Sequence, residues 1–341
     1  MERRVALYFV ASPLQYLAAR RIAERFEAGA RQVLAWYKRG VAPIVRAEHW
    51  DGAAYMAWPR LEPLPGPFGR LARLRANIRE IAALVGPCDT LHIHGAVFDT
   101  EAINYFLRAL PNACGARTMR ARILPDGIVS VRRYPLSPLK VAAQYARKLR
   151  RLVAPELDYW CFTGDRIGSD APFCDRIYVL PGLPHEYPAH KVVVLPPLVD
   201  RPPASGHATP RRALVIGQPL VGAGLMKTAD RDAVSREIRD WLRARGFAEI
   251  HYKAHPKDPH RELCEPDYTP IDPDEPLETY MSQERYAAVV GVRSSALLFA
   301  AQLYAETGAV LAFGLDRVLF KSAAERQKMR AALTLSGVSI L

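Results

Sequence analysis

Three polar clusters between Ile250 and Ala301 interrupt an apolar background, and together they could handle a phosphate group. They are Lys253-Ala-His255-Pro256, Pro276-Leu277-Glu278 and Ser294-Ser295. A cation, an imidazole, a carboxylate and two hydroxyls at the start of a helix can hold a nucleotide and protonate a phosphate as it leaves. The clusters therefore predict a site that binds a phosphorylated ligand.

The first cluster follows a predicted strand over Ile250–Ala254. Side chains two positions apart on a strand share a face, so Lys253 and His255 are expected to point the same way. Pro256 ends the strand and leaves His255 at its carboxyl edge, where open α/β sheets bind their ligands. A lone histidine in such a place is more often structural, as we expect of the deeper His251. The other two clusters favour a functional role for His255.

The second and third clusters open helices. Ser294 and Ser295 follow a predicted strand, and the free N–H groups and positive dipole end of the next helix favour a phosphate there. An ordinary helix cap would explain one of these serines equally well. A carboxylate at the start of a helix, such as Glu278, is stabilising in itself. Its alternative role is to accept hydrogen bonds from the hydroxyls of a ribose.

Further polar residues follow predicted strands elsewhere in the chain. Asp126-Gly127 is most simply a turn, but Asp126 could also act as a base opposite an imidazole acid. The first loop of each half, which carries Ser12 and Gln15 or Gly217 and Gln218, is a favoured place for ligand contact. No dinucleotide-binding glycine motif and no Walker A motif is present. Asp272-Pro273-Asp274 matches a metal-binding pattern but lies in a proline-rich loop where Asp is routine, so we predict no metal.

Strands and helices alternate along both halves of the chain, which predicts two open, Rossmann-like α/β domains with a ligand in the cleft between them. We expect domains at 1–195 and 212–341, joined by a proline-rich linker at 196–211. The strands predicted in the first half are Val5–Val10, Gln32–Tyr37, Thr90–His94, Arg122–Leu124, Tyr159–Thr163 and Ile177–Leu180. The helices predicted there are Pro13–Phe26, Phe68–Val85 and Thr100–Leu110. In the second half the predicted strands are Ala213–Ile216, Ile250–Ala254, Ala287–Val292 and Val310–Phe313, and the predicted helices are Ala229–Arg245, Leu277–Gln283, Ser295–Glu306 and Ser322–Leu335.

Charge and composition narrow the class of partner. The formal net charge is +12, which favours an anionic partner such as a nucleic acid, an anionic membrane face, or an acidic small molecule or polymer. The five scattered cysteines fit a reduced, cytoplasmic protein, and no stretch is long and apolar enough to cross a membrane. The basic stretch 140–151 is either a solvated helix face or a contact with anionic lipid, since Val141, Tyr145 and Leu149 fall on one side.

The set Asp-Gly, Lys-x-His-Pro, Pro-x-Glu and Ser-Ser, in this order and spacing, resembles bacterial sialyltransferases and polysialyltransferases of the GT-B fold. The opening Val-Ala-Ser-Pro-Leu-Gln and the later Ile-Gly-Gln-Pro-Leu are similar too. The resemblance implies an inverting, metal-independent transfer of a sialic or other nonulosonic acid from a CMP-sugar. The acceptor would be a bacterial surface polysaccharide or lipooligosaccharide, reached from the cytoplasm or the inner membrane surface.

The same resemblance implies roles for individual residues. Asp126 would be the general base, with Asp99 or Glu101 as the alternative, and His255 would protonate the leaving phosphate. Ser294 and Ser295 would hold that phosphate and Glu278 the ribose, while Lys253 and Pro256 would border the nucleotide pocket.

Two other hypotheses remain open at this point. A GT-B transferase with a UDP-sugar, GDP-sugar or CMP-Kdo donor would use the same fold. A basic nucleic-acid-binding protein would need exposed aromatic residues among its cations, and the arginines here lie on amphipathic helices without them.

Overall fold

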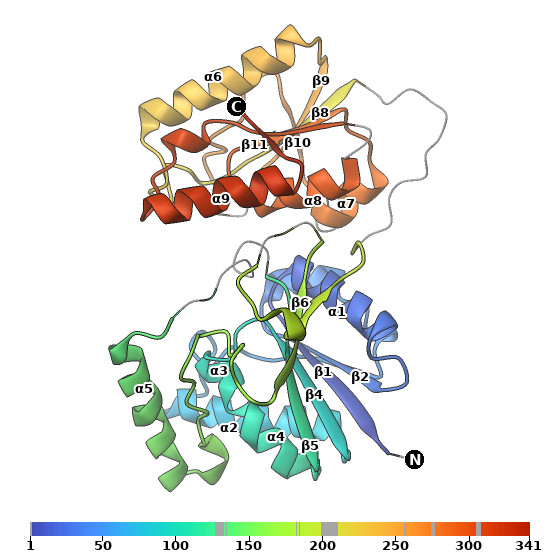
Figure 1. The fold of residues 1–341 in the computed structure, drawn as a ribbon, viewed down its shortest axis with the longest axis vertical. Coiled ribbons are helices and arrows are strands. Elements are labelled where there is room, and N and C mark those ends of the chain that lie inside the picture. The colour runs from blue at the N-terminus through green and yellow to red at the C-terminus, as the bar shows by residue number, and fades with distance from the viewer. Residues whose placement is uncertain are drawn as a thin grey trace. The chain divides into compact units, whose positions relative to one another are not determined.

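The structure, a computed structural model, describes residues 2–126, 133, 135–181, 183, 185–198, 211–255, 257–273, 277–304 and 308–341. The chain divides into two compact units. Unit 1 comprises Met1–Pro181 and His185–Leu198, and unit 2 comprises Gly182–Pro184 and Val199–Leu341. Of the predicted linker 196–211, residues 199–210 lie outside the described part of the chain. Each unit is built on one parallel sheet (Figure 1), which confirms the predicted α/β class.

Unit 1 contains a sheet of seven parallel strands in the order β3-β2-β1-β4-β5-β6-β7. In chain order these are β1 (Arg4–Val10), β2 (Arg31–Trp36), β3 (Gly52–Tyr55), β4 (Thr90–Gly95), β5 (Thr118–Ile123), β6 (Cys174–Val179) and β7 (Val192–Val194). The central strands are apolar runs buried on both faces, as parallel sheets require. The order reverses between β1 and β4, so the loops that follow these two strands diverge at the position where such folds bind ligands.

Helices cover both faces of this sheet. They are α1 (Pro13–Arg25), α2 (Gly69–Val85), α3 (Glu101–Asn104), α4 (Phe106–Cys114) and α5 (Pro138–Lys148), with short 3₁₀ turns η1 (Arg39–Ile44), η2 (Ala47–His49), η4 (Leu149–Leu152), η5 (Pro155–Leu157) and η6 (Ala189–Lys191). Right-handed crossovers put α1 on one face and α2 and α4, which pack together, on the other (Figure 1). The helix predicted over Thr100–Leu110 breaks at Tyr105 and extends to Cys114.

The strand predicted over Tyr159–Thr163 is wrong. These residues form no strand, although Tyr159 and Phe162 are buried. Side chains of two helices take the place of a neighbouring strand: the Trp160 N–H donates to Asn104 Oδ1 at 2.7 Å, and the Phe162 N–H donates to Gln144 Oε1 at 2.7 Å. With its backbone donors satisfied in this way, the aromatic segment packs in the core without joining the sheet.

A buried polar network lies beneath the middle of the unit 1 sheet. Glu27 accepts hydrogen bonds from His92 and from Arg122, and His94 lies 3.3 Å from the same carboxylate. Burial alone would raise the pKa of Glu27, but the bonds from the two histidines and the charge of Arg122 hold it well below its usual range. Burial lowers the pKa of His94. The network is enclosed by packing, so we assign it to the fold and not to ligand binding.

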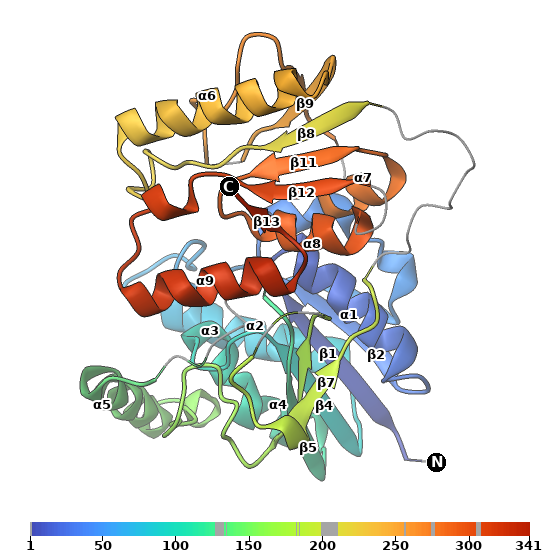
Figure 2. The same ribbon diagram turned by 45° about the horizontal axis from the view of Figure 1, so that its top comes forward.

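Unit 2 contains six parallel strands in the order β10-β9-β8-β11-β12-β13. They are β8 (Arg212–Ile216), β9 (Glu249–Lys253), β10 (Thr269–Ile271), β11 (Ala288–Gly291), β12 (Ala309–Ala312) and β13 (Ser339–Ile340). The helices α6 (Thr228–Ala244), α7 (Leu277–Gln283), α8 (Ser295–Tyr304) and α9 (Ala323–Leu335), with the turn η7 (Leu315–Arg317), complete the unit. α6 covers one face of the sheet, and α8 and α9 cover the other (Figures 1 and 2). The order reverses between β8 and β11, which brings the loops after β9, β8 and β11 to one edge.

Candidate functional site

The loops that carry most of the predicted residues of unit 2 are tied together at the carboxyl edge of its sheet. The Gly217 N–H donates to the Lys253 carbonyl at 2.9 Å, which joins the loops after β8 and β9. Gln218 Oε1 accepts from the Arg293 N–H at 2.8 Å, which joins the loops after β8 and β11. Gly217, Gln218 and Lys253 are therefore brought to the same edge as the start of α8.

Gly217 lies where no side chain fits. A Cβ added to it would lie 2.3 Å from Tyr252 Oη and 2.7 Å from Tyr252 Cζ. Tyr252 is fully buried, so it has no room to retreat. The glycine therefore lets the backbone after β8 approach β9 closely. A ligand at this edge could contact Gly217 only through its backbone.

His255 follows β9 and is half-buried. Its Nδ1 accepts a hydrogen bond from the Lys257 N–H at 3.0 Å, so in the neutral ring the proton is on Nε2. Burial, with the charge of Lys257, lowers the pKa of His255 against the opposing effect of Asp258. The unliganded ring is thus neutral at pH 7 and offers an Nε2–H to an acceptor oxygen. His251, by contrast, is bonded to Tyr286 Oη at 2.8 Å, in line with the structural role predicted for it.

Lys253 extends from the end of β9 and pairs with Asp272, whose carboxylate oxygen lies 2.5 Å from Lys253 Nζ. Asp272 is almost fully exposed, and the bond from Lys253 lowers its pKa. The first residue of the Asp-x-Asp pattern is therefore engaged with a lysine, while Asp274 and Pro256 lie outside the described residues. Within the described ranges, no group of three or more His, Cys, Asp or Glu side chains is placed to hold a metal ion.

The two serines have different surroundings at the start of α8. Ser294 Oγ accepts from the Ala296 N–H at 3.2 Å, as an ordinary cap does, and still carries a hydroxyl hydrogen to donate. Ser295 is exposed, and its hydroxyl has no partner in the part of the chain that the structure describes. Arg293, which the sequence analysis did not assign to the site, is half-buried over the Phe320 ring at 5.3 Å, and burial lowers its pKa. A desolvated cation beside the positive dipole end of a helix favours an anionic ligand.

Glu278 lies in the first turn of α7, which packs against α8. It is half-buried, and burial raises the pKa of its carboxyl. A second carboxylate, Glu262, was not predicted: it is buried and accepts from the Val221 and Gly222 N–H groups at 2.7 and 2.9 Å. Glu262 therefore fixes the loop after β8. It lies some forty residues further along the chain than this loop, so no local sequence pattern could reveal the contact.

The predicted residues of unit 1 meet at the carboxyl edge of the other sheet. Gln15 Nε2 donates to Asp126 Oδ1 at 2.8 Å, while Gln15 Oε1 accepts from the Ala11 N–H at 2.7 Å. Ser12 caps α1 by accepting from the Gln15 N–H at 3.3 Å. Because the buried Gln15 amide is held at both ends, it orients one oxygen of Asp126. Burial and the Asp126 charge raise the pKa of Tyr37, which places that carboxylate near the phenol.

The two carboxylates named as alternative bases in unit 1 both have side-chain partners. Asp99 is buried, accepts from Tyr159 Oη at 2.9 Å and lies 3.6 Å from Arg166. Glu101 pairs with both Arg70 and Arg150. Both alternative carboxylates are therefore held by basic or phenolic side chains of unit 1.

Comparison with known proteins agrees with this architecture. Residues 197–312 match the family model of alpha-2,8-polysialyltransferase. A sequence comparison with curated proteins found no match. The similar solved structures include UDP-GlcNAc 2-epimerase from Neisseria meningitidis bound to UDP-GlcNAc, with a TM-score of 0.52 at 12% identity over 98% of this chain and 86% of that one.

Two further structures are similar at the same level. The glycotransferase of kitacinnamycin gives a TM-score of 0.51 at 10% identity over 99% of this chain and 86% of that one. Arabidopsis thaliana UGT89C1 complexed with UDP-L-rhamnose gives 0.50 at 10% identity over 100% and 85%. Identities this low speak for the fold alone, which is GT-B. Over residues 197–312 the family match confirms the resemblance drawn from the motifs, and with the GT-B fold it supports a glycosyltransferase.

Proposed function

We propose that this glycosyltransferase moves a sialic or related nonulosonic acid from a CMP-sugar to a glycan hydroxyl, with inversion and without a metal ion. The observation that carries the proposal is the carboxyl edge of the unit 2 sheet. There, the Nε2–H of His255, the ammonium of Lys253 and the start of α8 with Ser294, Ser295 and Arg293 lie on adjoining loops.

These groups suit the departure of a nucleoside monophosphate. When the bond between the anomeric carbon and the phosphate oxygen breaks, the electron pair stays on that oxygen and CMP gains a second negative charge. In many enzymes, hydrogen-bond donors fixed in advance where this charge develops lower the reaction barrier more than any other effect. A proton from His255, together with the cations and the helix dipole, can stabilise that charge.

The acceptor half of the reaction is assigned to unit 1. Asp126 takes the proton of the acceptor hydroxyl as that oxygen bonds to the anomeric carbon, and a single displacement inverts the configuration. Gln15 donates a hydrogen bond to one oxygen of Asp126. Because the Gln15 amide is buried, this bond fixes the orientation of the carboxylate. Ser12 acts through the cap of α1, and Glu278 is proposed to accept from the ribose hydroxyls.

Donor choice tests the proposal directly. We expect the protein to hydrolyse CMP-sialic acid, or transfer from it, at the same rate with and without a chelator such as EDTA. UDP-GlcNAc, a GDP-sugar and CMP-Kdo serve as matched donors in the same assay. If the protein turned over a UDP- or GDP-sugar but not CMP-sialic acid, the proposed donor would be wrong. If it preferred CMP-Kdo, the proposed nucleotide would be right and the proposed sugar wrong. A chelator-sensitive rate would contradict metal independence.

The pKa of His255 predicts how the rate depends on pH. A general acid must be protonated, and burial keeps the pKa of His255 in the free protein below the usual value of about 6.5. We therefore expect kcat/KM for the donor to fall as the pH rises through that lowered value. Bound phosphate favours the protonated ring, so kcat, which reports the complex, should hold to a higher pH than kcat/KM. Initial rates between pH 5 and 9 check this, and identical profiles for the two parameters would contradict it.

Peripheral contact with an anionic inner membrane is the second part of the proposal. Around α5 and η4, five large apolar side chains are exposed: Leu139, Tyr145, Leu149, Leu152 and Val153. Val141, which we predicted beside them, is half-buried instead. Cations border this face, which is the pattern of a helix that lies on anionic lipid. No helix in the described ranges has the length and apolar character to cross a membrane.

The described cysteines form no disulfide, which fits the proposed cytoplasmic side. Sedimentation with vesicles tests the membrane contact. Binding should require anionic lipid and should fall when Leu149 and Leu152 are replaced by serine. If this variant bound the vesicles as well as the parent protein does, the proposed contact of α5 and η4 with the membrane would be wrong.

A further inference from the structure

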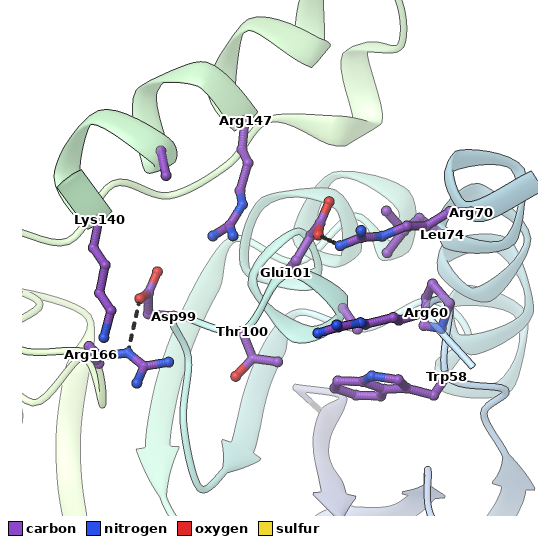
Figure 3. A pocket seen from close by; sticks show the side chains of 13 residues that line it. Trp58, Arg60, Arg70, Leu74, Asp99, Thr100, Glu101, Lys140, Arg147 and Arg166 are labelled. Carbon is purple, nitrogen blue, oxygen red and sulfur yellow. Dashed lines mark hydrogen bonds and ion pairs between the residues drawn. The ribbon is translucent and has the colours of Figure 1, made fainter. Parts of the chain in front are cut away.

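A pocket of about 300 Å³ lies entirely within unit 1, at the carboxyl edge of its sheet (Figure 3). Its wall comes from the loop after β3, the start of α2, the loop after β4, the inner face of α5 and Arg166. Five cations line it: Arg60, Arg70, Lys140, Arg147 and Arg166. They face only two carboxylates, Asp99 and Glu101, so the lining carries an excess of positive charge.

The cations fall into two groups. Arg70 pairs with Glu101, and Arg166 lies 3.6 Å from Asp99. Arg147 donates to Tyr159 Oη at 3.2 Å and so has a fixed position. In Figure 3 the side chains of Lys140 and Arg60 extend into the pocket from opposite sides, and neither forms an ion pair with a carboxylate in the described part of the chain. The pocket thus combines two cations paired with carboxylates, Arg70 and Arg166, with three that have no ion pair in the described part of the chain.

The other cations of this region act on Arg70. Burial and the nearby charges of Arg150, Arg147 and Arg60 lower its pKa, although Glu101 is bonded to it. Keeping several guanidinium groups together costs free energy unless an anion lies among them. Planar guanidinium groups match the geometry of a carboxylate, so a carboxylate is the anion that this lining suits.

The pocket is connected to the predicted base through aromatic side chains. Trp58 forms one side of it and stacks on Tyr37, with 4.6 Å between the ring centroids. Tyr37 in turn senses the charge of Asp126, which raises its pKa together with burial. A sugar bound in the pocket would therefore lie beside Trp58, whose stacking partner Tyr37 is within range of the Asp126 charge.

We propose that this pocket binds a carboxylated sugar residue of the acceptor glycan, with Arg60, Lys140 and Arg147 on its carboxylate. The inference rests on the proposed function in one respect, the identity of the ligand as an acceptor. The volume fits one sugar residue and its carboxylate better than a whole oligosaccharide. The site thus selects acceptors that carry a negative charge near the hydroxyl to be modified.

Binding without donor or turnover tests the proposal separately from the transfer reaction. The probe is a short oligosaccharide of sialic acid, titrated calorimetrically, and its carboxyl-reduced counterpart is the neutral match. Removing two pocket cations in Arg60→Ala/Lys140→Ala should weaken binding of the acidic probe at least 10-fold and leave the weak binding of the neutral one unchanged. Both side chains are exposed, so this variant should fold.

A charge-matched control separates the pocket from the general positive charge. Arg117 and Arg120 lie at the other end of β5, outside the pocket, and are exposed. Arg117→Ala/Arg120→Ala should bind the acidic probe within two-fold of the parent. Equal losses in the two double variants, or equal binding of the acidic and neutral probes, would overturn the proposal. So would a pocket-dependent loss seen only with vesicles of anionic phospholipid, which would assign the cations to lipid phosphate.

Discussion

His255→Ala is expected to lower the rate of CMP-sugar turnover by about 10²- to 10⁴-fold, the range that a positioned acid or base contributes. The loss should appear in kcat, because the imidazole acts on the charge that develops as CMP leaves. The side chain is half-buried, and within the described ranges its one hydrogen bond is from the Lys257 N–H, so its removal should leave the fold intact. Steady-state kinetics with circular dichroism as the check on folding measures both.

His260→Ala provides the matched control for this first prediction. His260 is an exposed histidine on the same turn, five residues further along the chain. Its replacement should leave kcat within about two-fold of the parent. If His255→Ala retained most of the parent rate, or if the two variants were equally slow, the general acid would have to be sought elsewhere.

Asp126→Asn is expected to reduce transfer to the acceptor by a similar factor, about 10²- to 10⁴-fold. Asparagine keeps the shape of the side chain and an oxygen that can accept from Gln15 Nε2, so the local structure should persist. Only the capacity to take the acceptor proton is lost. Product formation at saturating acceptor, followed by chromatography, measures the effect.

Asp99→Asn distinguishes the two possible bases of unit 1. Asp99 is held by Tyr159 and lies near Arg166, so its replacement should raise the KM for the acceptor more than it lowers kcat. Should Asp99→Asn prove the more damaging to kcat, the base assignment would move from Asp126 to Asp99. A fully active Asp126→Asn enzyme would contradict the assignment in either case.

The fold could be predicted from the sequence where the strands are continuous apolar runs. The runs that became β1, β8 and β11 are of this kind and are followed by polar or turn residues. Four short strands were missed, among them β13, which has two residues, and β10, which contains a proline. The error at Tyr159–Thr163 has another origin: helix side chains bond its backbone, and no local pattern records such a long-range contact.

The loops that form the candidate site could be predicted from the sequence, but the contacts between them could not. Residues that follow parallel strands meet at one edge, so Lys253, His255 and the serines could be assigned to it from their places in the sequence. The partners that fix them could not be. The contact of Gln15 with Asp126 spans 111 residues, and the clamp of Glu262 on the loop after β8 spans about forty.

The basic pocket of unit 1 illustrates the same limit. Its cations come from four separate segments, and in the sequence each looks like an ordinary surface residue of a basic chain. The net charge predicted an anionic partner but not where it binds. Only the topology brings Arg60 and Lys140 to one cavity.

Hydrogen exchange in the presence and absence of CMP tests most directly whether the unit 2 edge is the nucleotide site. Peptides that contain Gly217–Gly222, Lys253–Lys257 and Arg293–Leu297 should exchange more slowly when CMP is added, and UMP should protect them less. Slowed exchange confined to other segments, or none at saturating CMP, would contradict the assignment on which the transferase mechanism depends.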